Sequence, residues 1–237
     1  MKNNYNDIID IILTFALDNE LIDSMVISGS IVPYLVLEKE SDEFCNDLYI
    51  LVEEKKMNFV RRKLKKLSKE YLFDIISDSK VNTNLDHGFK IKYEDTIASF
   101  FPYSIVNNNL TIKNYWINKN EKTLTLKTKV IPNIIKSSVI RIINFSDDKN
   151  IRIMTPEFIL IDKILKEKKS DDSNALTMKF LDEISDESIM DSLKESIKEQ
   201  KVKIIRKKIN NNNLMFLITL FVLLLILLIV TYICFKK

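Results

Sequence analysis

An uninterrupted apolar run near the end of the chain limits what this sequence can fold into more than any other feature. Residues Leu214 to Phe235 read LMFLITLFVLLLILLIVTYICF and contain no charged side chain. An α-helix rises about 1.5 Å per residue, so a helix over this run would be about 33 Å long, close to the ~30 Å hydrocarbon core of a bilayer. We therefore predict a single transmembrane helix over 214–235.

Charges on the two sides of this run predict its orientation. Two lysines, Lys236 and Lys237, follow the run, and no signal peptide is apparent at the N-terminus, where the apolar stretch is broken by Asp10. The preceding segment is richer in basic residues, and these are Lys201, Lys203, Arg206, Lys207 and Lys208. Because basic flanks stay on the cytoplasmic side, we predict a single-pass membrane protein with its body in the cytoplasm. Lipid contacts are expected through Leu214 to Phe235 and through the basic segment Lys201 to Lys208, for which setting topology alone is the alternative role.

Composition narrows the class of the body. Lys and Arg total 36 against 33 Asp and Glu, and this near-balance argues against a nucleic-acid partner. A hydrophobic content of 46% suffices for a globular core. The single histidine, His87, excludes most zinc sites, and we expect it in a loop rather than in a catalytic role. Cys45 and Cys234 form no disulfide framework, since Cys234 lies within the apolar run.

Hydrophobic periodicity predicts the elements of the body. Helical spacing covers 4–22, 31–38, 55–71, 155–168, 174–184 and 187–208, and strand-like runs occupy 25–28, 48–52, 72–76, 89–93, 97–101 and 123–130. The basic run RRKLKK in 55–71 is interpreted as a solvated helix face rather than a nucleic-acid patch.

This order of elements predicts an α/β (α+β) body with one mixed sheet, flanking helices and a helical C-terminal part. We divide the chain into a domain over 1–185, a basic juxtamembrane helix and linker over 186–213, and the membrane helix over 214–235.

Two motifs carry a family resemblance. The segment SGSIVPYLVLEKESDEFCNDLYILVEE resembles the nucleotidyltransferase superfamily pattern of a strand, a Gly-Ser turn, a helix, and a carboxylate pair on the next strand. The segment TPEFILIDKIL, residues 155–165, resembles a helix of the bacterial abortive-infection nucleotidyltransferase toxins. The resemblance implies a nucleotidyltransferase-like mixed sheet and, in an active member, Mg²⁺ and a nucleoside triphosphate as cofactor and substrate.

The resemblance also assigns candidate site residues. Gly29 and Ser30 match the turn whose backbone N–H groups approach phosphate oxygens, and Asp47 matches the first metal-binding, catalytic carboxylate. Lys163 takes the place of a family lysine that could contact phosphate, although an exposed lysine on a well-capped helix explains it equally. The second carboxylate position is Tyr49, and the strand expected to carry the third has Ala98 and Ser99.

These departures leave several functions open. One is a catalytically degenerate module, a pseudoenzyme, that binds a nucleotide or a protein partner, with no cofactor firmly implied. A second is an active metal-dependent enzyme that moves a nucleotidyl group from a nucleoside triphosphate to a hydroxyl of a protein, RNA or small molecule. That enzyme would need other acids, for which Asp42, Glu43, Glu94 and Asp95 are the local candidates. A third is a structural membrane protein with no pocket near Gly29.

Overall fold

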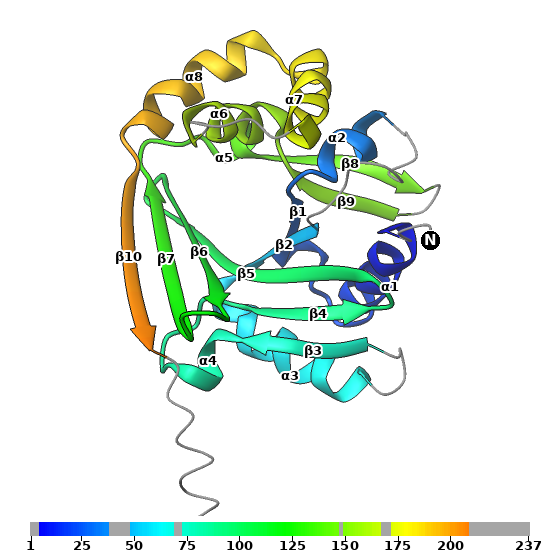
Figure 1. The fold of residues 1–237 in the computed structure, drawn as a ribbon. Coiled ribbons are helices and arrows are strands. Elements are labelled where there is room, and N and C mark those ends of the chain that lie inside the picture. The colour runs from blue at the N-terminus through cyan, green and yellow to red at the C-terminus, as the bar shows by residue number, and fades with distance from the viewer. Residues whose placement is uncertain (1–4, 38–47, 69–72, 147–148, 167–171, 209–237) are drawn as a thin grey trace, which may run out of the picture.

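The computed structural model describes residues 5–37, 48–68, 73–146, 149–166 and 172–208, which form a mixed sheet with flanking helices (Figure 1). The helices are α1 (Tyr5–Asp18), α2 (Val32–Leu37), α3 (Met57–Leu67), α4 (Ser79–Asn82), α5 (Lys136–Val139), α6 (Pro156–Lys166), α7 (Asp172–Ile184) and α8 (Glu187–Lys198). The strands are β1 (Met25–Ser28), β2 (Leu48–Glu53), β3 (Phe73–Asp78), β4 (Phe89–Tyr93), β5 (Thr96–Val106), β6 (Asn109–Asn118), β7 (Thr123–Ile131), β8 (Ile140–Ser146), β9 (Lys149–Met154) and β10 (Lys201–Lys208). The predicted mixed α/β class is confirmed.

The sheet branches at its longest strand, β5. Its order is β10-β7-β6-β5-β2-β1-β9-β8, with β4 and then β3 added to β5. β4 pairs with 96–100 of β5, whereas β6 pairs with 103–106, and Pro102 lies between the two stretches. Proline lacks an N–H and suits a point where ladder pairing changes. The branch lets β6, β7 and β10 turn away from β3 and β4 (Figure 1).

Helix α3 covers the β3–β4–β5 side of the sheet. Its buried residues Met57, Val60 and Leu64 recur at helical spacing, which places them on one face. Beneath it, Phe89 and Phe100 are cross-strand partners whose rings stack with centroids 4.7 Å apart. The buried faces of the strands and of α3 thus pack together in one continuous apolar core.

The structure agrees with many elements predicted from periodicity and corrects others. Strand β1 lies where it was predicted, and β4 and β5 form the predicted hairpin with Glu94 and Asp95 at its turn. The prediction of one helix over 187–208 is wrong, because the helix ends at Lys198 and 201–208 is a strand paired antiparallel with β7. A partner strand supplies hydrogen bonds that the local sequence cannot reveal, so context overrides local preference here. Strands β6, β8 and β9 were not predicted.

None of the helices in the described ranges combines the length and apolar character needed to cross a bilayer. The predicted membrane helix over 214–235 lies outside the described residues, as does the linker from residue 209. The anchor and the domain boundaries therefore remain predictions.

Candidate functional site

The Gly-Ser turn follows β1 directly and has the backbone conformation that glycine favours. Gly29 has φ +95°, in the left-handed region where a β-carbon is costly. Its carbonyl oxygen accepts a hydrogen bond from the N–H of Val32, at 3.2 Å, where α2 begins. The strand, the turn and the helix therefore occur in the order that the resemblance implied, with α2 six residues long.

The two positions expected to hold the missing carboxylates lie side by side. Strands β2 and β5 are parallel and pair Tyr49 with Ser99, while the antiparallel pairing of β1 and β2 sets Ser28 opposite Tyr49. Ser28, Tyr49 and Ser99 thus form one row across three neighbouring strands. The first carboxylate candidate, Asp47, lies outside the described residues.

Glu94 and Asp95, two of the acids that an active enzyme would recruit, lie away from this row. Both are exposed at the turn between β4 and β5, and Asp95 forms a long ion pair with Lys92 at 3.9 Å. Asp95 lies four positions before Ser99, which corresponds to about 13 Å along a strand. The other two acids, Asp42 and Glu43, lie outside the described residues.

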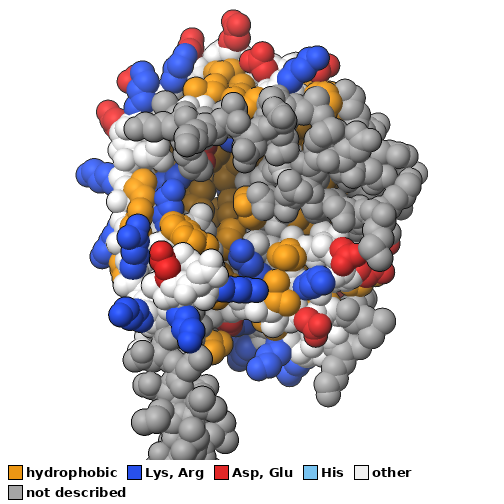
Figure 2. Space-filling view, viewed as in Figure 1, with side chains coloured by type: hydrophobic (Ala, Val, Ile, Leu, Met, Phe, Trp, Pro, Cys, Tyr) orange, Lys and Arg blue, Asp and Glu red, His pale blue; other side chains and the backbone are white. Residues whose placement is uncertain are grey.

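A cavity of about 350 Å³ lies at the Gly29 turn, within the size range of small-molecule sites. Figure 2 shows the hollow, with an apolar floor and Lys or Arg side chains near its rim. Strands β2, β5 and β9 contribute to it, with α6 and the β6–β7 pair also lining it. Its lining residues are Ser28, Gly29, Tyr49, Leu51, Lys90, Phe101, Ile112, Asn114, Tyr115, Trp116, Lys127, Lys129, Met154, Phe158, Ile159, Asp162 and Lys163.

The cavity brings together some of the residues predicted from sequence. Gly29, Tyr49 and Lys163 line it, whereas Ser30 and Ser99 are not among its described lining residues. Lys163 lines the cavity from α6, and this helix begins at the predicted position. Pro156 is the first helical residue, and Thr155 accepts a hydrogen bond from the N–H of Phe158 at 3.4 Å.

An aromatic row forms part of the cavity lining. The ring of Tyr49 lies 5.6 Å from that of Phe101, and Phe101 meets Tyr115 edge to face at 6.2 Å. The Lys90 ammonium lies 5.9 Å from the centroid of the Tyr115 ring, within cation–π range. Burial raises the pKa of Tyr115, so its hydroxyl stays neutral and shares a 2.6 Å hydrogen bond with Ser77.

Sequence reasoning missed three of the four lysines that line the cavity. They are Lys90 on β4 and both Lys127 and Lys129 on β7. Spacing of two residues sets Lys127 and Lys129 on one face of β7, opposite Asn114 and Ile112 of β6. The alternation Leu-Thr-Leu-Lys-Thr-Lys was therefore a usable signal, whereas Lys90 had none.

Asp162 is the one acid among the described lining residues, and it is already ion-paired. Its carboxylate bonds the Lys129 ammonium across the cavity, from α6 to β7, with side chains 14% and 8% exposed. Nearby, the Asn114 side-chain oxygen is buried and has no hydrogen-bond partner among the described residues. The cavity therefore presents mainly cationic groups above an apolar floor.

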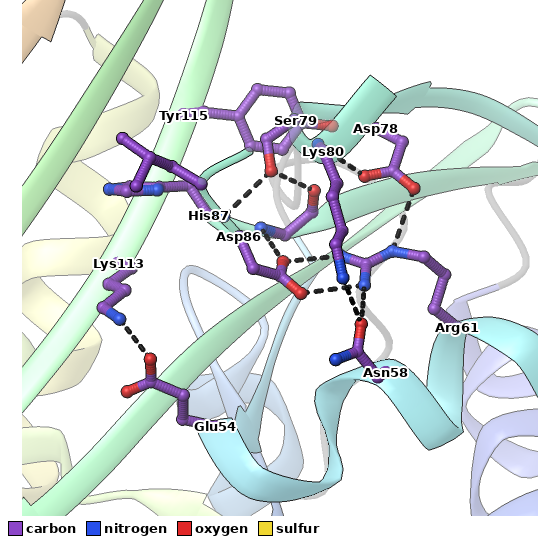
Figure 3. Close-up of polar contacts among 12 residues, drawn as sticks. Glu54, Asn58, Arg61, Asp78, Ser79, Lys80, Asp86, His87, Lys113 and Tyr115 are labelled. Carbon is purple, nitrogen blue, oxygen red and sulfur yellow. Dashed lines mark hydrogen bonds and ion pairs between the residues drawn. The ribbon is translucent and has the colours of Figure 1, made fainter. Parts of the chain in front are cut away.

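A polar cluster fixes the loop before β4 (Figure 3). Arg61 of α3 lies between Asp78 and Asp86, at 2.9 Å and 2.5 Å. Burial alone would raise the pKa of Asp86, but hydrogen bonds and charge from Arg61 outweigh it and hold the pKa below its usual value. Arg61 was part of the run interpreted as a solvated face, and the structure corrects that interpretation for this residue, whose side chain is 11% exposed.

His87 belongs to the same loop and supports β7 from behind. It is buried, and its Nε2 lies 3.1 Å from the hydroxyl of Thr128, which sits between the two β7 lysines and faces the other way. Burial first, and then the Lys113 charge, lower its pKa, so the ring is neutral at neutral pH. Its position in a loop agrees with the expectation from sequence.

Of the comparisons with known proteins, the one with solved structures found a similar fold. No family model and no curated protein matches the chain. The solution structure of the antibiotic-resistance factor ANT(2'')-Ia, an aminoglycoside nucleotidyltransferase, is similar with a TM-score of 0.54 and 13% identity, over 84% of this chain and 93% of that one. At this identity the likeness concerns architecture. The chain therefore has a nucleotidyltransferase-like mixed α/β fold.

Proposed function

We propose that this protein is a nucleotidyltransferase-like module that binds a nucleotide in the cavity at the Gly29 turn and transfers no nucleotidyl group. One observation carries the proposal: Gly29, Lys163 and three further lysines line a single cavity together with several aromatic side chains. Phosphates suit lysine ammonium groups, and a planar base suits apolar and aromatic side chains. The same arrangement favours a small-molecule ligand over a purely structural body.

The absence of transfer is argued from the row of Ser28, Tyr49 and Ser99. In the family that the sequence resembles, positions equivalent to 49 and 99 carry carboxylates that hold metal ions. Tyrosine and serine hydroxyls supply no negative charge there at neutral pH. A clamp of two metal ions needs several anionic oxygens, which Asp47 alone does not provide.

A labelling experiment tests this proposal. The purified full chain, given each nucleoside triphosphate labelled at the α-phosphate with Mg²⁺ or Mn²⁺, is expected to label neither itself nor an added protein or RNA. Asp47→Asn serves as the matched variant and should change nothing. Robust labelling that Asp47→Asn abolishes would contradict the proposal and favour the active, metal-dependent transferase, with acids from other segments.

The membrane assignment is part of the same proposal. Strand β10 ends at Lys208, so only five uncharged residues, 209–213, separate the folded body from the apolar run over 214–235. Five residues span at most about 18 Å, which keeps the basic β10 strand near lipid headgroups if the run enters a bilayer.

Cell fractionation measures this attachment. We expect the full chain in the membrane fraction after a high-salt wash, because salt screens surface charge and leaves a buried apolar helix in place. A chain lacking 209–237 should leave the membrane. Recovery of the full chain in the soluble fraction would contradict the anchor. If the chain were instead held at the membrane by a protein partner bound at the cavity mouth, the high-salt wash would release it.

A further inference from the structure

We infer that the lysines of this cavity take the place of divalent metal as the counter-charge for the ligand, so that a ligand with several phosphates binds without Mg²⁺. This inference rests on the proposed function and specifies its chemistry. In the fold family the phosphates are held through metal ions on carboxylates. Here the described lining of the cavity carries mainly positive charge, where that family has negatively charged carboxylates.

The described residues do not fit a metal site. Mg²⁺ keeps its waters unless several anionic oxygens replace them. Within the described ranges, no three His, Cys, Asp or Glu side chains are grouped closely enough to hold a metal ion. Among the described lining residues the one acid is Asp162, which is bonded to Lys129, and a cation placed beside it would also face that ammonium group. Neighbouring ammonium groups repel a divalent cation further.

The lysines fit phosphate instead, and they come from different sides of the cavity. Lys163 projects from α6, Lys127 and Lys129 come from β7, and Lys90 comes from β4. A single phosphate has few oxygens to share among four ammonium groups that come from three elements. A chain of two or three phosphates is long enough to contact several of them at once. Each lysine acts as a point charge that donates hydrogen bonds to phosphate oxygen.

The rest of the lining distinguishes a nucleotide from inorganic polyphosphate. The cavity lining includes Tyr49, Phe101 and Phe158, which offer apolar surface that a base would cover and a bare polyphosphate would not. The buried side-chain oxygen of Asn114 is an acceptor that an exocyclic amino group of a base could satisfy. We therefore expect a nucleoside di- or triphosphate to bind more tightly than inorganic tripolyphosphate, and both more tightly than a nucleoside monophosphate.

The experiment is a titration of the full chain in detergent with adenosine mono-, di- and triphosphate and with inorganic tripolyphosphate. Each titration is run with excess EDTA and with Mg²⁺. Trp116 lines the cavity and is the only tryptophan, so its fluorescence reports occupancy directly. We expect the triphosphate to bind in EDTA at least as tightly as in Mg²⁺, because metal-bound phosphates carry less charge for the lysines to pair with.

Variants assign the effect to the lysines. Lys127→Gln with Lys163→Gln should weaken triphosphate binding by about 100-fold or more, since each hydrogen bond to a charged group contributes the equivalent of about tenfold or more. The matched control is Lys179→Gln with Lys194→Gln, which removes two charges from exposed positions on α7 and α8 and should leave affinity unchanged. Thermal unfolding of both variants checks that each remains folded.

The outcomes separate this inference from the proposed function. Binding that requires Mg²⁺ and disappears in EDTA overturns the inference and leaves nucleotide binding intact. Binding in EDTA that the cavity variant does not weaken also overturns it. If no ligand binds either in EDTA or in Mg²⁺, the proposed function is overturned as well. Tripolyphosphate binding as tightly as the nucleotide supports the lysine site and contradicts the nucleotide as its ligand.

Discussion

Replacing Gly88 by alanine is expected to lower the free energy of unfolding by about 2–5 kcal/mol. Gly88 has φ +109°, and a β-carbon added there would lie 2.1 Å from the carbonyl oxygen of Phe100 and 2.9 Å from the ring of Phe101. The clash is with backbone rather than with a flexible side chain, so the neighbour cannot simply rotate away. Urea unfolding of the full chain in detergent, followed by Trp116 fluorescence, measures the loss.

The obstacle at Gly88 is rigid because β5 is paired on both edges around Phe100. Phe100 is opposite Phe89 on β4 and Ile50 on β2. The matched control is Asn84→Ala, at an exposed position of the same loop, where a change within about 0.5 kcal/mol is expected. A loss below about 1 kcal/mol for Gly88→Ala would show that the loop rearranges and that its left-handed conformation is not required.

Gly88 also connects stability to the cavity. Its N–H donates a hydrogen bond to Asp86 at 3.1 Å, and its carbonyl oxygen accepts from the Ser79 hydroxyl at 2.9 Å. Lys90 follows two residues later on β4 and reaches the cavity from there. A displaced loop would therefore move one of the four lysines, and we expect weaker ligand binding by Gly88→Ala even under conditions where it remains folded.

The sequence identified the strands that form the centre of the sheet, and β7 beside the cavity, but missed β6 and β9, which also line the site. The compact apolar runs of β1 and β2 are largely buried strands, which local pattern identifies well. The pairing of Tyr49 with Ser99 is consistent with the family resemblance, which placed both at carboxylate positions. Strand β10 was missed because its sequence, KVKIIRKK, has weak alternation and is stabilised by its pairing with β7.

The site itself was only partly accessible from the sequence, for a physical reason. Gly29 and Lys163 belong to local motifs, and both line the cavity. Lys90 and the β7 lysines reach the same cavity only because β5 branches, and no local pattern encodes a branch. Arg61 did carry a signal, since it lies four residues after the buried Met57 and so on the same helical face.

Replacing Arg61 by methionine is expected to lower the free energy of unfolding by about 3 kcal/mol at pH 7, the low end of the range for breaking a buried ion pair. Arg61 pairs with Asp78 and Asp86, whose side chains are 13% and 20% exposed, so its removal leaves two poorly solvated carboxylates close together. Methionine keeps much of the apolar contact with Phe89, whose ring centroid lies 5.2 Å from the guanidinium carbon. Urea unfolding measures the difference, and Arg62→Met, at the exposed neighbouring position, is the control with an expected change within about 0.5 kcal/mol.

The dependence of this loss on pH shows whether it is ionic. Burial raises the pKa of Asp86, but Arg61 outweighs it and lowers the pKa in the folded protein, so the native pair stabilises fully above the usual pKa of an aspartate. The contribution of the ion pair to stability disappears as the pH falls through the lowered pKa that Asp86 has in the folded protein. In Arg61→Met the burial that raises the pKa of Asp86 is opposed only by the Gly88 N–H and the Lys80 charge. The variant is therefore relieved of part of its penalty as the carboxylate takes up a proton. The difference between the two proteins should therefore narrow steadily between about pH 6 and pH 3. A difference that stays constant over this range would assign the contribution of Arg61 to its packing on Phe89 rather than to its charge.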